Sequence, residues 1–165
     1  MNLIIDNITG HWGDQILIVT HGRGGIKQDK VEGDGATPVG SFPFRCVYYR
    51  RDRIGELETA LPKIEITPDH GWCDDPEDPT YNKPVKLPYP ARHEEMWRDD
   101  HLYDIVVVVG HNDDPVVKNK GSAVFIHLMH ENSTPTAGCI GLEKEDLIHV
   151  LKTATLKSCL VVNPL

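Results

Sequence analysis

Short apolar runs separated by polar, turn-forming stretches dominate the chain. The strongest run spans residues 103–109 and holds four consecutive valines, a pattern typical of a buried, central strand. The polar region 7–13 predicts a turn between the first two runs. Further strand-like runs occupy residues 3–5, 15–20, 42–49, 122–128 and 159–162. The pattern therefore predicts a mainly β chain.

One segment, residues 143–152, has a helical pattern. Acidic residues crowd its first turn, where they complement the helix dipole, and an apolar face follows at Leu147, Val150 and Leu151. The chain has 165 residues and contains no repeat and no linker that would divide domains. We therefore expect a single domain over residues 1–165, mainly β, sandwich-like or barrel-like, with one or two short helices.

A proline-rich segment interrupts the strand pattern. Residues 67–101 hold six of the twelve prolines and two of the three tryptophans. Long ordered loops of this kind are usually binding loops or lids. Two interpretations stay open for residues 68–98: a lid over a substrate, or a structural insertion packed by Trp72 and Trp97.

Charge and hydropathy narrow the classes of partner. The formal net charge is −8, and a nucleic-acid partner would need a concentrated basic face instead. Four arginines do gather near one predicted strand, either as a solvated strand edge or as a site for a substrate carboxylate. They are Arg45, Arg50, Arg51 and Arg53. No apolar run approaches the roughly 18 residues of a membrane span, so we expect no membrane partner.

The first 20 residues lack the basic start of a secretory signal. We therefore expect a cytoplasmic protein, or a periplasmic one if an export signal was removed. Cytoplasmic cysteines are normally reduced. The four cysteines lie far apart without a CxxC pair, so two disulfides in three possible connectivities stay open outside the cytoplasm. They are Cys46, Cys73, Cys139 and Cys159.

Cys139 is the strongest candidate for chemistry. Small residues precede it, and Gly138 permits a tight turn whose successive N–H groups can converge on one oxyanion. His127, twelve positions upstream on a predicted strand, is the candidate base that a cysteine nucleophile requires. From the residues alone, an inert buried cysteine and a core histidine remain the open alternatives.

A metal-dependent peptidase is a second enzymatic alternative. Histidines and carboxylates suit zinc, although no HExxH spacing supports such a site. We predict no metal and no cofactor. The polar cluster that begins at His111 is either a turn or part of the active site. The candidate ligands are His111, Asp113, Asp114, His127 and His130.

Three segments resemble the L,D-transpeptidase catalytic domain family (YkuD-like). They are Ser122–His127, Pro135–Ile140 and, further upstream, Glu32–Pro43 with its Thr-Pro-Val-Gly-Ser-Phe sequence. The resemblance covers nearly the whole chain. Many members carry a histidine where this chain has Ala137, and Arg or Asn where it has Gly141. The stretch from His127 to Cys139 is also shorter than in typical members.

The resemblance implies that Cys139 attacks the carbonyl of a diamino acid in a peptidoglycan stem peptide, with His127 as base. The Ala137–Gly138 turn would supply the oxyanion site through the amides of Gly138 and Cys139. A carbonyl of Ser122 or Ala123 would orient His127. The candidate substrate-binding residues are His111, Thr136, Trp72 and Tyr81.

Two outcomes are possible for the resulting thioester. Water gives an L,D-carboxypeptidase that releases the terminal D-amino acid of a stem tetrapeptide, and an amine gives an L,D-transpeptidase. We expect the carboxypeptidase, because cross-linking needs access to the wall. The partner would be a stem peptide or muropeptide. A non-catalytic binder of wall peptides is the remaining alternative.

Overall fold

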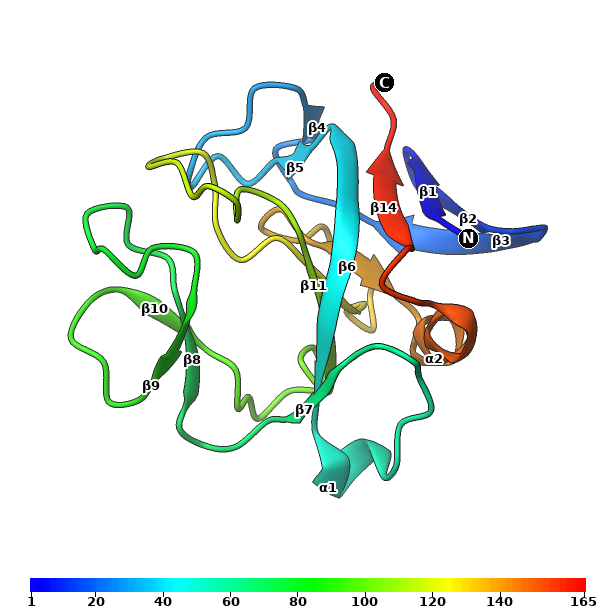
Figure 1. Ribbon diagram of the computed structural model, residues 1–165. Coiled ribbons are helices and arrows are strands. Elements are labelled where there is room, and N and C mark those ends of the chain that lie inside the picture. The colour runs from blue at the N-terminus through cyan, green and yellow to red at the C-terminus, as the bar shows by residue number, and fades with distance from the viewer.

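A sheet that closes on itself forms the centre of the molecule (Figure 1). The computed structural model describes residues 1–165. Strand β6 pairs with β14 on one side and with β11 on the other, so eight strands form a closed barrel and β7 extends from it. The strand order is β11 (Ile105–Val109), β12 (Phe125–Leu128), β13 (Ile140–Leu142), β3 (Gln15–Thr20), β2 (Thr9–Trp12), β1 (Leu3–Asp6), β14 (Cys159–Val162), β6 (Gly40–Tyr49) and β7 (Lys63–Glu65).

Two helices accompany the barrel, α1 (Arg51–Ile54) and α2 (Lys144–Thr153). Helix α2 follows β13 and buries Leu147, Val150 and Leu151 in the barrel core. Its last residue, Thr153, accepts a 2.9 Å hydrogen bond from the indole N–H of Trp12. Neither helix has the length and apolar character that crossing a membrane requires.

Two smaller sheets lie outside the barrel. Strands β4 (Ile26–Lys27) and β5 (Thr37–Pro38) form a parallel pair. The proline-rich segment contributes β8 (His70–Cys73), β9 (Pro84–Lys86) and β10 (His93–Glu95), in the order β10-β8-β9. Figure 1 shows this three-stranded sheet to one side of the barrel, beyond β11 and β6.

Strand β11 is buried on both faces, which explains its run of valines. Val107 and Val109 belong to the barrel core, whereas Val106 and Val108 belong to a second apolar cluster. That second cluster includes Trp72 from the proline-rich segment, whose ring meets the ring of Phe125 edge-on at 5.0 Å between centroids. Burial on both faces favours β-branched residues at every position of the strand.

The predicted fold class is confirmed: the chain is mainly β, with a barrel-like sheet and two short helices. Strands β3 and β14 match the predicted ranges 15–20 and 159–162. The predicted turn at 7–13 is confirmed at its two ends, Asn7–Ile8 and Gly13, but Thr9–Trp12 between them form β2, which pairs with β1 and β3. The predicted strand at 122–128 begins only at Phe125, since Ala123 has a φ of +50° that strand pairing does not accommodate.

Candidate active site

A cavity of about 950 Å³ lies between the barrel and the proline-rich segment. The barrel contributes His127 from β12 and the turn that ends at Cys139. The proline-rich segment contributes a wall that includes Glu94 of β10 and Arg98. Cys139 and His127, the two residues predicted to carry chemistry, therefore line the same cavity.

The thiol of Cys139 is buried and engaged by backbone groups. Its Sγ lies 3.1 Å from the carbonyl oxygen of Ala123, to which it donates, and accepts an N–H from Phe125 at 3.4 Å. Burial raises the pKa of Cys139 to about 12, and the negative charge of Glu94 adds to that rise. The residue is therefore a neutral thiol at physiological pH, with no hydrogen bond to His127.

His127 is held as the tautomer that a general base requires. Its Nδ1 lies 2.8 Å from the carbonyl oxygen of Leu128, and because a carbonyl only accepts, Nδ1 carries the proton and Nε2 is free. Burial lowers the pKa of His127 to about 4, so the imidazole is neutral at physiological pH. The orienting carbonyl is thus that of Leu128, not that of Ser122 or Ala123 as expected.

The turn before Cys139 differs in one respect from the predicted oxyanion site. The amide of Gly138 donates to the Thr136 hydroxyl at 3.0 Å, and that hydroxyl donates to the Cys139 carbonyl at 2.6 Å. The amide of Gly138 is therefore occupied, whereas the amides of Cys139 and the exposed Ala137 make no hydrogen bond within the protein. An oxyanion donor at this turn is the amide of Cys139 rather than that of Gly138.

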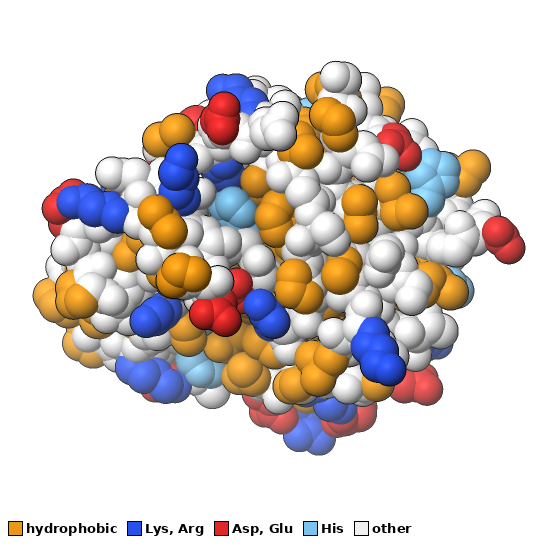
Figure 2. All heavy atoms as spheres, turned by 45° about the horizontal axis from the view of Figure 1, so that its top comes forward, with side chains coloured by type: hydrophobic (Ala, Val, Ile, Leu, Met, Phe, Trp, Pro, Cys, Tyr) orange, Lys and Arg blue, Asp and Glu red, His pale blue; other side chains and the backbone are white.

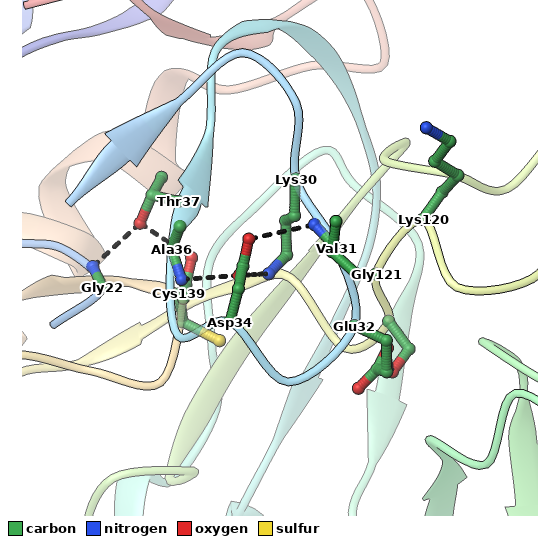
Figure 3. A network of polar contacts seen from close by, with 12 residues as sticks. Gly22, Lys30, Val31, Glu32, Asp34, Ala36, Thr37, Lys120, Gly121 and Cys139 are labelled. Carbon is green, nitrogen blue, oxygen red and sulfur yellow. Dashed lines mark hydrogen bonds and ion pairs between the residues drawn. The ribbon is translucent and has the colours of Figure 1, made fainter. Parts of the chain in front are cut away.

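Thr37 fixes the other side of this turn (Figure 3). Its hydroxyl accepts from the amide of Gly22 at 2.9 Å and donates to the carbonyl of Gly138 at 2.9 Å. Gly138 has a φ of +136°, and a Cβ there would lie 2.8 Å from the carbonyl oxygen of Ala36. The Thr-Pro segment therefore packs directly behind the cysteine turn, which leaves room for glycine only.

Lys30 and Asp34 stiffen the same segment (Figure 3). Lys30 is buried and pairs with Asp34 at 2.9 Å, while Asp34 also accepts the amides of Val31 and Ala36. Burial raises the pKa of Asp34, but those two amides and the Lys30 ammonium outweigh it and lower the pKa to about 2. Sequence reasoning missed Lys30, since an isolated lysine in a loop gives no signal.

Asn82, in the proline-rich segment, holds the residue that contacts the thiol. Its Oδ1 accepts the amide of Ala123 at 3.0 Å and the indole N–H of Trp72 at 3.1 Å. Its Nδ2 donates to the carbonyls of His111 and Asn112. The segment is therefore packed onto the barrel by buried polar contacts, as the structural-insertion interpretation expects, and it also forms one wall of the cavity.

Of the four predicted substrate-binding residues, only Thr136 lines the main cavity. Trp72 and His111 line a separate cavity of about 200 Å³. The hydroxyl of Tyr81 donates to Glu32 at 2.5 Å and accepts the amide of Gly121. These three side chains therefore do not line the cavity that holds Cys139, and their role in substrate binding stays a prediction. Ser122 does line the main cavity and donates to Glu32 at 2.8 Å.

The residues of the metal alternative do not form one cluster. His111 and Asp113 line the smaller cavity, whereas His127 and His130 line the larger one. No group of three or more histidine, cysteine or acidic side chains is arranged to hold a metal ion. This geometry does not support the five-residue site.

The four arginines also lie away from the cavity. Each is paired with a carboxylate: Arg45 with Asp113, Arg50 with Asp52, Arg51 with Glu65 and Arg53 with Asp104. Arg50 is buried, and its guanidinium lies 3.4 Å from the ring centroid of Trp97. Basic and acidic side chains are likewise interspersed on the face shown in Figure 2. These contacts fit structural roles rather than a carboxylate site.

The charges in the cavity are mostly, but not all, neutralised by neighbours. Ion pairs join Lys30 to Asp34, Arg92 to Asp74 and Arg98 to Asp100. Four charged lining residues have no ion pair: Glu94, which is partly buried, and the exposed Arg23, Glu95 and Asp99. None of them was predicted from the sequence, because each is one charged residue among many. Glu94 is distinguished only by being unpaired and partly buried at once.

Comparison with known proteins places this geometry in a family. The model of the L,D-transpeptidase catalytic domain (YkuD) matches residues 6–162, which include the proline-rich segment, the cysteine turn and the barrel except for most of β1. Comparison with curated proteins and with solved structures gave no match. Because the family model spans nearly the whole chain, the protein belongs to the YkuD family of L,D-transpeptidase catalytic domains.

Proposed function

We propose that the protein is a cysteine L,D-carboxypeptidase that removes the terminal D-amino acid from peptidoglycan stem tetrapeptides. Its family performs cysteine-dependent chemistry on peptides derived from peptidoglycan. One observation carries the assignment of roles: Cys139 and His127 line one cavity, and the Leu128 carbonyl leaves Nε2 of His127 free to accept a proton. A neutral thiol and a neutral imidazole then act as nucleophile and general base.

The acylation half-reaction begins when the S–H of Cys139 turns from the Ala123 carbonyl towards Nε2 of His127. As Nε2 takes the proton, sulfur bonds to the peptide carbonyl carbon, and the carbonyl oxygen becomes an oxyanion that accepts the amide N–H of Cys139. The intermediate then expels the D-amino acid. Its amine leaves with the proton from the His127 imidazolium, and the acyl group remains on sulfur as a thioester.

Water completes the reaction. His127 takes a proton from the water as its oxygen bonds to the thioester carbon. The carbon–sulfur bond then breaks, sulfur regains the proton from the imidazolium, and the tripeptide leaves with a new carboxylate. In an L,D-transpeptidase an amine would take the place of this water, with the same residues acting.

Arg23 is the residue suited to bind the terminal carboxylate of a tetrapeptide. It lies at the cavity rim without an acidic partner, and its side chain runs alongside Gly35. A free guanidinium suits a carboxylate because it offers two parallel N–H donors.

The surroundings of Cys139 favour water over an amine acceptor. Ala137 is exposed but offers only a methyl group. Gly141 is buried in β13, and a Cβ there would lie 2.4 Å from the hydroxyl oxygen of Thr20, so this position cannot present a polar side chain to the cavity. The packed proline-rich segment also closes one side of the cavity, which restricts the approach of a second peptide.

Mass spectrometry of a stem tetrapeptide incubated with the protein tests this proposal. We expect tripeptide and free D-amino acid, with no product from Cys139→Ala. In a parallel reaction with excess D-methionine, exchange faster than tripeptide formation would identify a transpeptidase instead. Binding of the tetrapeptide without any product would identify a non-catalytic binder.

A further inference from the structure

Glu94 is a carboxylate in the cavity that lacks a cationic partner. It lies on β10, opposite Trp72 of β8, and its Oε2 accepts a hydrogen bond from the Tyr103 hydroxyl at 2.5 Å. No lysine, arginine or histidine lies within ion-pair distance of it. The nearby Arg98 is already committed, because its guanidinium donates to both oxygens of Asp100 at 2.8 and 2.6 Å.

An unpaired carboxylate that is partly removed from water is costly, so a cation that enters the cavity has a favourable place beside it. The other acidic residues around the cavity do not offer this. Glu32, Asp34, Asp74 and Asp100 each have an ion pair, and the unpaired Glu95 and Asp99 are exposed to water. Burial raises the pKa of Glu94, as expected for a carboxylate whose charge is not compensated.

Tyr103 connects Glu94 to the candidate catalytic pair. Its hydroxyl donates to Glu94, and its ring packs against the imidazole of His127 at 5.4 Å between centroids. The charge of Glu94 also reaches the thiol, because it contributes to the raised pKa of Cys139. Only the side chain of Tyr103 would therefore separate a cation beside Glu94 from His127.

We propose that Glu94 binds the side-chain ammonium of the residue whose carbonyl Cys139 attacks, and so selects acyl donors with a free side-chain amine. This inference rests on the proposed function and names the residue that recognises the diamino acid. Ion pairing with the ammonium also neutralises the charge of Glu94. The substrate itself thereby removes one of the effects that disfavour negative charge on sulfur.

Two tetrapeptides test the inference. They are identical except that the diamino acid carries either a free side-chain amine or an acetylated one. A charge-assisted contact predicts that the wild type prefers the free amine in kcat/KM on the order of 10- to 100-fold. Glu94→Gln should lose most of this preference by slowing only the free-amine peptide. Glu58→Gln, at an exposed position without an ion pair and outside the cavity, should retain it.

A binding measurement separates this inference from the proposed function. Calorimetry gives the affinity of each peptide for Cys139→Ala, which cannot turn either of them over. Cys139→Ala should bind the free-amine peptide more tightly than the acetylated one, and the double variant that also carries Glu94→Gln should lose this preference. A preference that survives Glu94→Gln, or a wild type without preference, overturns the role of Glu94. A wild type that binds the free-amine peptide selectively but cleaves neither peptide overturns the proposed function alone. Glu94→Asp, which withdraws the charge by one methylene, serves if Glu94→Gln does not fold.

Discussion

The thiol of Cys139 donates a hydrogen bond to the carbonyl oxygen of Ala123 across 3.1 Å. Ala123 has a φ of +50°, a conformation that is uncommon for alanine and has to be held by its surroundings. The amide of Ala123 is fixed by Asn82, which belongs to the proline-rich segment. The wall of the cavity and the position of the nucleophile are therefore coupled through one asparagine side chain.

Asn82→Ala should lower both activity and stability. It removes the acceptor for the Ala123 and Trp72 N–H groups and the donor to two backbone carbonyls. Leaving such buried groups unpaired costs about 1–3 kcal/mol each. We expect a lower Tm and a kcat reduced on the order of 10-fold as Ala123 relaxes. Asn163→Ala, which loses an exposed contact to Asp6, is the control. An unchanged kcat in Asn82→Ala would show that Ala123 does not position the thiol.

The pH dependence of kcat/KM should reflect the free base of His127. Burial lowers its pKa to about 4, so the imidazole is competent above that pH and is protonated below it. The rate should fall as the pH drops through about 4 and should be flat between about pH 6 and 9. Circular dichroism at each pH separates this titration from unfolding. An activity that instead declines below about pH 7 would mean that His127 titrates with an ordinary pKa.

Thiol labelling of the free protein should spare Cys139. Burial raises its pKa to about 12, and it raises that of Cys46 to about 11. Cys73 is buried, and burial raises its pKa as well. Because the thiolate is the reactive form, the partly exposed Cys159 should react with a disulfide reagent first. Peptide mapping after brief labelling identifies the site. Cys139 reacting first would indicate a preformed thiolate and a mechanism without proton transfer at the attack.

Thr37→Val tests the brace behind the cysteine turn. The substitution keeps the shape of the side chain but leaves the Gly22 amide and the Gly138 carbonyl without their partner. We expect a loss of about 1–3 kcal/mol in unfolding free energy for each unpaired group. The kcat should fall more than KM rises, because the turn carries the oxyanion donor, which acts in the transition state. If Thr37→Val loses this stability but keeps the kcat of the wild type, Thr37 has a structural role only.

Local pattern was sufficient for much of the fold. The strands at 15–20 and 159–162 and the helix at Lys144–Thr153 follow from alternation and from acidic residues ahead of an apolar face. Strand β2 was missed because its sequence, Thr-Gly-His-Trp, contains a glycine and little apolar character. Only its pairing with β1 and β3, which buries Trp12, makes it a strand.

The sequence by itself determined the mainly β class and, through the family resemblance, the candidate roles of Cys139 and His127. Only the tertiary structure decided the closure of the barrel between β6 and β11 and the partners of the polar side chains. Apolar periodicity is a local property that reports burial, whereas a hydrogen-bond partner can come from anywhere in the chain. The Leu128 carbonyl at His127, Asn82 behind Ala123 and the unpaired Glu94 thus became visible only when distant segments were brought together.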